Sequence, residues 1–233
     1  MEKGMKVYAA EFTGTFALCF IGQGAICAQQ LTGASGLLAV AVAHGLALAV
    51  MISALMAVSG AHFNPAVSFG FFLTGRQSAP SMFSYWLAQL LGAVVASLAL
   101  RALFPSSTWH AVHLGAAQVR GGLPPLGGLL AEFVMTFFLV TAVWGTAVDE
   151  RRPPIGGFGI GLAVTMDILV GGPLTGAAMN PARALGPALV ANFWNGHWVY
   201  WMGPLLGGGT AAVAYDRWIL GGKASPTAAR KRS

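Results

Sequence analysis

Residues 59–67 read SGAHFNPAV, and residues 175–183 read TGAAMNPAR. Both stretches contain the tripeptide Asn-Pro-Ala, formed by Asn64, Pro65 and Ala66 in the first and by Asn180, Pro181 and Ala182 in the second. Asn followed by Pro is a helix-start signal. The Asn side chain can accept from N–H groups of the first turn, and Pro at the first helical position lacks an N–H that would have no partner there. We therefore predict two short helices, near residues 62–73 and 178–191.

The composition indicates an integral membrane protein that lies in a lipid bilayer. Of the 233 residues, 56% are hydrophobic and 9% are charged, whereas a soluble domain carries roughly 25% charged residues. The 32 glycines agree with this, because small residues let membrane helices pack closely. Much of the net charge of +6 lies near the chain ends, so we expect it to face phospholipid and expect no nucleic-acid partner.

Six segments are long and apolar enough to cross a membrane, which takes about 20 residues each. They cover residues 6–28, 36–58, 82–103, 126–147, 156–171 and 197–220. An even number of spans puts both termini on one side, which then carries ten Lys and Arg residues against three on the other. The positive-inside rule makes that side cytoplasmic, and the short termini suit the plasma (inner) membrane of a prokaryote.

The two short helices are too short to span, so we interpret them as re-entrant half-helices that line a cavity. The chain also repeats itself around them. Each half carries an Ala-Glu-Phe, a Gly-Leu-Ala and a Trp-containing heptapeptide, at residues 10–12 and 131–133, 45–47 and 161–163, and 86–92 and 201–207. Three spans per half is an odd number, so the second half is inserted upside down and the half-helix N-termini meet near the midplane.

The predicted fold class is therefore an all-α membrane protein with six transmembrane helices, two re-entrant half-helices and an inverted internal repeat. We expect one channel domain over residues 1–222, with repeats at about 6–115 and 126–222. Residues 223–233 are expected to form a short basic cytoplasmic tail.

With these motifs, the chain resembles an aquaporin of the major intrinsic protein family. The resemblance covers nearly the whole chain and rests on residues 59–67, on MNPAR at 179–183 and on HWVYW at 197–201. It implies a homotetramer with one water-conducting pore per subunit and no cofactor. The physics agrees, because each half-helix N-terminus carries roughly half a positive charge, and two facing ends form a barrier to cations and hydronium.

The pore itself needs donors and acceptors along its length. The amides of Asn64 and Asn180 can donate to one water molecule while their carbonyl oxygens cap the half-helices. The extended stretches before each tripeptide are expected to supply backbone carbonyls as a row of acceptors. The residues concerned are Gly60, Ala61, His62, Thr175, Gly176 and Ala178.

The resemblance also implies a selectivity filter at four positions, which hold His44, Ile168, Ala177 and Arg183. This set is similar to that of the plant tonoplast intrinsic proteins, which are associated with ammonia or urea passage besides water. Ammonia is therefore our hypothesis for a further permeant, whereas the motif positions that mark glycerol facilitators hold alanines. An unsatisfied Arg183 inside the membrane indicates a function by itself. Protonation of His44 at low pH is expected to reduce ammonia flow.

Glu11, Glu132 and Asp167 are acidic residues inside the predicted spans. Glu11 and Glu132 occupy equivalent places in the two halves, so an inverted repeat sets them too far apart for acid–base catalysis. We expect each to accept from backbone N–H groups near its half-helix, and we expect no catalytic residue and no metal site. Asp167 is expected either to pair with Arg183, His113 or a loop amide, or to have a buried hydrogen-bonding role without effect on transport. A proton-coupled secondary transporter is the alternative function, and Asp167 is its only indication.

Overall fold

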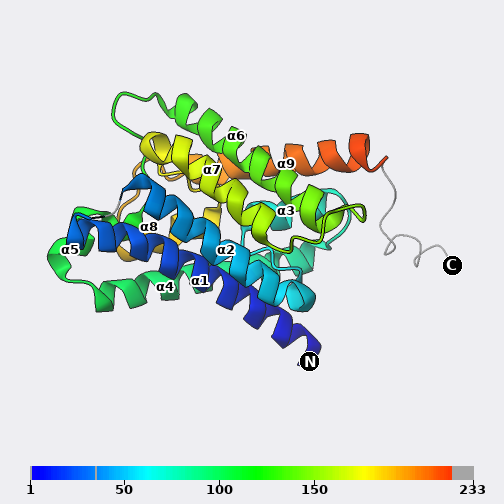
Figure 1. Cartoon of the computed structure of the whole chain (residues 1–233), viewed down its shortest axis with the longest axis horizontal. Coiled ribbons are helices and arrows are strands. Elements are labelled where there is room, and N and C mark those ends of the chain that lie inside the picture. The colour runs from blue at the N-terminus through cyan, green and yellow to red at the C-terminus, as the bar shows by residue number, and fades with distance from the viewer. Residues whose placement is uncertain (1, 35, 222–233) are drawn as a thin grey trace.

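The chain, in a computed structural model, is described over residues 2–34 and 36–221, and within these residues it is helical with no β-strand. Six long helices pack side by side in one bundle (Figure 1). They are α1 (Glu2–Thr32), α2 (Leu37–Ser59), α4 (Ala79–Leu103), α6 (Pro125–Val143), α7 (Phe158–Thr175) and α9 (Val199–Ala214). The predicted tail at residues 223–233 lies outside the described residues.

The long helices confirm the predicted membrane fold. Five of them, all except α9, are long and apolar enough to cross a membrane. Helix α9 has 16 residues and continues into a π-helical turn, η3 (Tyr215–Ile219). Together they rise by about 30 Å, which matches the thickness of a bilayer's hydrocarbon core, about 30 Å. The start of α1 and the end of η3 lie at the same end of the bundle (Figure 1).

Helix α7 runs further than the sequence predicted. A break was expected at residues 171–173, which read Gly-Gly-Pro, but the helix continues through Pro173 and ends at Thr175. Proline removes only one intrahelical hydrogen bond, and its place in the last turn keeps the kink small. Gly176 then ends the helix in a left-handed conformation with φ +80°, and its N–H donates to Gly172 O. The longer helix brings the chain close to the second Asn-Pro-Ala.

The two predicted half-helices are present as α3 (Pro65–Leu73) and α8 (Pro181–Val190). Both begin at the proline, three residues later than expected, because the residues before each tripeptide are irregular, with several in left-handed backbone conformations, and not helical. They lie in opposite halves of the bundle (Figure 1). Nine or ten residues rise by about 15 Å, so each half-helix is long enough to cover half of the bilayer core.

The remaining elements lie at the two ends of the bundle. The connection between α4 and α6 contains α5 (Ser106–Ala111) and the short 3-10 turn η1 (His113–Gly115). At the end where the termini lie, α6 continues into a second π-helical turn, η2 (Trp144–Val148). The largest apolar core joins α2, α6 and α7 to the residues before each half-helix, including Phe63 and Met179. This core therefore fixes the position of the half-helix tips.

Candidate permeation pathway

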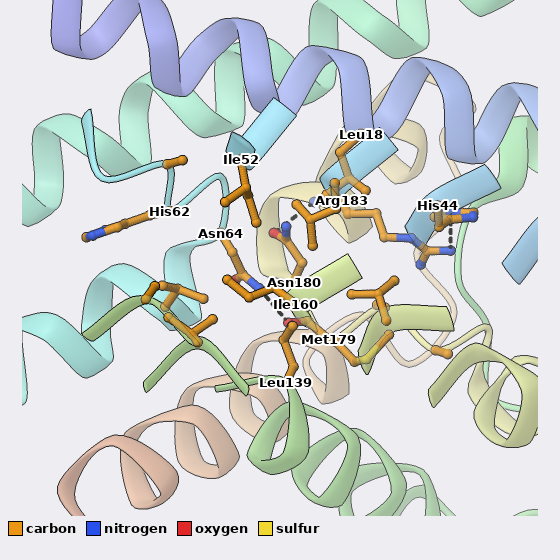
Figure 2. A pocket seen from close by; sticks show the side chains of 18 of the residues that line it. Leu18, His44, Ile52, His62, Asn64, Leu139, Ile160, Met179, Asn180 and Arg183 are labelled. Carbon is orange, nitrogen blue, oxygen red and sulfur yellow. Dashed lines mark hydrogen bonds between the residues drawn. The ribbon is translucent and has the colours of Figure 1, made fainter. Parts of the chain in front are cut away.

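The N-termini of α3 and α8 meet through a reciprocal pair of hydrogen bonds, of which Figure 2 draws the one between Asn64 and Met179. Asn64 Nδ2 donates to Met179 O at 2.9 Å, and Asn180 Nδ2 donates to Phe63 O at 2.8 Å. The side-chain oxygens cap the helices. Asn64 Oδ1 accepts from Ala66 N at 2.8 Å, and Asn180 Oδ1 accepts from Ala182 N at 2.9 Å and from Arg183 N at 3.2 Å. Each amide has two N–H groups, so each keeps one to donate to a permeating molecule.

Two buried carboxylates hold the extended stretches that lead to these tips. Glu11 Oε1 accepts from Ser59 Oγ at 2.7 Å and from His62 N at 3.0 Å, while Oε2 accepts from Phe63 N at 2.7 Å and from Gln89 Nε2 at 2.8 Å. Every partner is a donor, so the carboxylate needs no proton to satisfy its contacts. The arrangement matches the role expected for Glu11.

Glu132 repeats this arrangement in the second half of the chain. Its Oε1 accepts from Thr175 Oγ1 at 2.7 Å and from Ala178 N at 2.9 Å, and its Oε2 accepts from Met179 N at 2.7 Å. These three donors lie 116 residues after Ser59, His62 and Phe63, the donors to Glu11.

Left-handed backbone makes this support necessary. Phe63, Ala177 and Met179 have φ values of +50°, +44° and +52°, and this conformation costs roughly 1–2 kcal/mol for a residue with a side chain. The hydrogen bonds to Glu11 and Glu132 hold the chain in this conformation, because Phe63 N and Met179 N are among the groups they bind. The extended stretches therefore keep a fixed shape around the tips.

Two tyrosines, for which the sequence predicted no hydrogen bonds, complete this frame. Tyr85 Oη donates to Ser59 O at 2.7 Å, and Tyr200 Oη donates to Thr175 O at 2.8 Å. The repeat contained a signal for them, because a tyrosine precedes the matched tryptophan in both halves, at residues 85–86 and 200–201.

The four predicted filter residues line the same cavity. His44 and Arg183 are almost fully buried, and Arg183 Nη2 lies 3.2 Å from His44 Nε2 (Figure 2). His44 Nδ1 lies 2.8 Å from Val40 O, which can only accept. We therefore assign the proton to Nδ1, so that neutral His44 accepts from Arg183. Ile168 and Ala177 add apolar wall.

Arg183 keeps two donor atoms without a protein partner. Its main-chain oxygen accepts from Gln23 Nε2 at 2.9 Å, which fixes the backbone at this point. Within the described residues, the buried Nε and Nη1 atoms have no hydrogen-bond acceptor. An unpaired buried donor is costly, so these atoms are placed to donate to a molecule in the cavity.

The cavity lies between the two halves of the chain. Its polar lining includes His44, His62, Asn64, Asn180 and Arg183, and the rest is mostly apolar. Figure 2 shows the two asparagines near the middle of this lining, with His44 and Arg183 to one side and His62 to the other. The cavity therefore combines a few donors with walls that offer little to bind.

Two of the six residues expected to supply carbonyls do not line this cavity. Gly60, Ala61, His62 and Ala178 do line it, but Thr175 does not. The Thr175 carbonyl instead accepts from Tyr200 Oη, and its hydroxyl donates to Glu132.

Gly176 is the second of these residues. It lines two pockets that it shares with Arg183 and not the cavity between the tips. Gly176 is the C-cap residue of α7, so it lies beyond the part of this helix that lines the cavity between the tips.

Asp167 makes none of the three contacts expected of it. It is 5% exposed, and within the described residues its buried Oδ2 has no hydrogen-bond partner. Asp167 does not line the cavity, but at about 100° per residue it lies at the edge of the α7 face that carries the lining residues Ile160 and Val164. It shares a face of α7 with Gly171, which packs against Met135 of α6. Asp167 therefore lies between α6 and α7.

The end of the cavity nearest the termini is lined by Phe71, Val143 and Ala147. Beyond it, the loop after η2 is held by Asp149, whose carboxylate accepts from the Arg151 side chain at 2.6 and 2.9 Å and from Tyr215 Oη at 3.2 Å. The hydrogen bonds from Arg151 hold the pKa of Asp149 well below its usual range. This loop therefore stays ion-paired at any physiological pH.

Long apolar helices around a cavity with two facing half-helix tips define a polytopic membrane channel. The chain belongs to the major intrinsic protein family, whose model matches residues 2–215. It is 45% identical over 225 residues to "Probable aquaporin TIP3-2" of Arabidopsis thaliana, a match that covers 91% of this chain and 82% of that protein. It is 46% identical over 222 residues to "Aquaporin TIP4-4" of Zea mays, covering 91% and 86%.

A solved structure shares the fold. The X-ray structure of the aquaglyceroporin from Plasmodium falciparum superposes with a TM-score of 0.82 at 27% identity, covering 93% of this chain and 97% of that one. The all-α fold expected from the sequence is therefore that of a known membrane channel.

Proposed function

We propose that this chain is a passive channel that carries water across a membrane, with His44, Ile168, Ala177 and Arg183 as its filter. The observation that carries this proposal is the reciprocal bonding of the two half-helix tips inside the cavity. Each tip carries roughly half a positive charge. Together they repel cations at the midplane, and the remaining amide N–H groups donate to the oxygen of each passing water.

The filter favours small neutral molecules with a lone pair. Arg183 presents the unpartnered donors Nε and Nη1, while both ring nitrogens of His44 are engaged, with Arg183 and Val40. A water oxygen or an ammonia nitrogen can accept from Arg183, whereas an ammonium ion is repelled by its charge. We therefore propose ammonia as a second permeant. Glycerol is disfavoured by Ala184 and Ala188, as the family pattern suggests.

The structure gives no support to proton-coupled transport. Asp167, the residue that indicated it, does not line the cavity. The family and its curated relatives are channels, so we propose no enzymatic activity.

The proposed organisation is one channel domain, residues 1–222, made of two inverted repeats. The matched bonding of Glu11 and Glu132 supports this division. We also propose a homotetramer and, from the charge asymmetry, cytoplasmic termini. The relatives named above are plant proteins and give no support to a prokaryotic plasma membrane, so no host membrane is proposed.

Osmotic shrinkage of proteoliposomes in a stopped-flow instrument tests the proposed function. We expect fast water flow with a low activation energy and no dependence on an ion gradient. Flow that saturates, or that follows a pH gradient, would indicate a carrier. Ammonia passage is measured in the same vesicles by the alkalinisation of an enclosed pH dye after addition of ammonium chloride. The control is protein-free liposomes of the same lipids.

A further inference from the structure

A groove on the outside of the bundle lies between α3 and the C-terminal part of α9, away from the permeation pathway. Ten residues line it: Phe69, Leu73, Leu205, Leu206, Gly209, Thr210, Val213, Ala214, Arg217 and Trp218. Its lining is apolar apart from Thr210 and Arg217. Figure 1 shows α3 and the end of α9 in the same part of the bundle, near the end where the termini lie.

The groove extends over the depth of one bilayer leaflet. Helix α3 starts at the meeting point of the two tips and has nine residues, so it rises by about 14 Å. Half of a typical hydrocarbon core is about 15 Å thick. Along α9, the lining runs from Leu205 to Trp218, roughly 20 Å of helix.

The bottom of the groove exists because residue 209 is glycine. A Cβ atom added there would lie 2.9 Å from Leu73 Cδ1 and 3.2 Å from Phe69 Cε1. The groove is therefore shaped by close packing of α9 against α3, with room on its outer side for a slender apolar chain.

The outer end of the groove carries a cation and an aromatic ring. Trp218 is 84% exposed, and tryptophan prefers the level of the lipid headgroups. Within residues 2–34 and 36–221, the Arg217 guanidinium makes no ion pair. Its neighbour Asp216 is already bound by Arg76, whose Nη2 and Nε donate to Asp216 Oδ1 at 2.6 and 3.1 Å. Arg217 is thus available to an anion from the membrane.

We propose that this groove binds an anionic phospholipid of the leaflet on the side of the termini. One acyl chain lies along α9 between Phe69 and Val213, and the phosphate pairs with Arg217 beside Trp218. Charge and depth select this occupant, because a leaflet-deep apolar groove that ends in a cation complements an acyl chain that ends in a phosphate. The site is independent of the solutes that the channel passes.

Fluorescence quenching by brominated lipids tests the proposal on the full-length protein in liposomes. Phosphatidylglycerol and phosphatidylcholine with the same dibrominated chains are titrated separately into a background of unbrominated phosphatidylcholine. The Trp218 signal is the difference between the wild type and Trp218→Phe. We expect phosphatidylglycerol to quench at about fivefold lower mole fraction, the equivalent of ~1 kcal/mol per basic residue at an anionic headgroup.

Three variants distinguish a specific site from general attraction to the surface. Arg217→Gln should reduce the fivefold preference for phosphatidylglycerol over phosphatidylcholine to about onefold. Thr210→Phe fills the groove from its exposed side and should lower this preference at least twofold. Lys6→Gln removes an exposed cation at the start of α1, away from α9 in Figure 1, and should leave the preference unchanged. Water flow in the same liposomes reports that each variant folds.

Several results would overturn the proposal. They are equal quenching of the wild type by both lipids, a preference that survives Arg217→Gln, or an equal loss of preference in Lys6→Gln. If neither lipid quenches Trp218 and Thr210→Phe changes the mass of the detergent-solubilised assembly, the groove is an interface with a second copy of the chain.

Discussion

Replacement of Glu132 by glutamine tests whether a buried carboxylate holds the second half-helix tip in place. Glu132 is fully buried and accepts three hydrogen bonds, from Thr175 Oγ1, Ala178 N and Met179 N. Glutamine keeps one acceptor oxygen, so one backbone N–H then faces an NH₂ group. An unsatisfied buried donor costs about 1–3 kcal/mol, and each remaining bond loses about 1 kcal/mol when its acceptor is no longer charged.

These contributions add to a destabilisation of roughly 3–5 kcal/mol, which is a large part of a typical total stability of about 5–15 kcal/mol. We expect a matching loss in the free energy of unfolding of the purified protein in detergent. Water flow per channel should also fall severalfold, because Ala177 and Met179 are then less firmly held in their left-handed conformation. Glu11→Gln should behave similarly, since its backbone donors occupy the corresponding places.

Glu150→Gln is the matched control, because Glu150 is exposed in the loop after η2. It should change the unfolding free energy by less than about 0.5 kcal/mol, as surface substitutions usually do. The reasoning fails if Glu132→Gln is as stable as Glu150→Gln and conducts water equally well.

Three further predictions concern the filter and one loop. Arg183→Val should leave water flow within about twofold but admit urea and ions, measured as solute uptake by liposomes; unchanged exclusion would refute it. Ala177→Leu should block the cavity and lower water flow at least tenfold, whereas Ala102→Leu on the exposed end of α4 should not. Burial lowers the pKa of His197, whose Nε2 accepts from Trp201 at 3.2 Å. Below the unfolded pKa of about 6.5, the unfolded chain therefore binds a proton on His197 that the folded protein does not. The free energy of unfolding then falls by up to ~1.4 kcal/mol per pH unit as the pH decreases from about 6.5 toward the lower pKa of the folded protein, and above about 6.5 this loss is absent. His197→Gln should remove this part of the pH dependence of unfolding, and an unchanged profile would contradict the assignment.

Local chemistry explains which parts of the site could be predicted. An Asn-Pro pair determines a helix start within a few residues, so the tips at Asn64 and Asn180 followed from the sequence. A carboxylate in an apolar span must find donors, and the repeat placed Glu11 and Glu132 at equivalent points. These features depend on neighbours in the chain or on symmetry, both of which can be read from the sequence.

Other features depend on contacts that no local pattern contains. Whether the Thr175 carbonyl faces the pore depends on Tyr200, which lies 25 residues further along and takes that carbonyl as its acceptor. The orientation of Asp167 depends on the rotation of α7, a helix that packs against both α2 and α6 and lines the cavity with a further face. An apolar stretch fixes the presence of such a helix but not its rotation.

The proposed repeat also explains why the proposed filter lies at one end of the cavity. Adding or subtracting 116 residues converts each filter position into a position of the other half, and all four of these also line the cavity. The counterparts of His44, Ile168, Ala177 and Arg183 are Ile160, Ile52, Ala61 and Val67.

Two substitutions therefore separate the filter from its counterpart: a histidine in place of an isoleucine and an arginine in place of a valine. The midplane barrier is built from elements that both halves share, and those elements also hold the backbone together. Among the residues that the structure describes, by contrast, the His44 side chain bonds only within its own helix and to Arg183, and the Nε and Nη1 atoms of Arg183 have no partner there. Solute choice can thus change at these two positions while the ion barrier and its supporting carboxylates stay intact, because the fold does not depend on those side chains for its own hydrogen bonds.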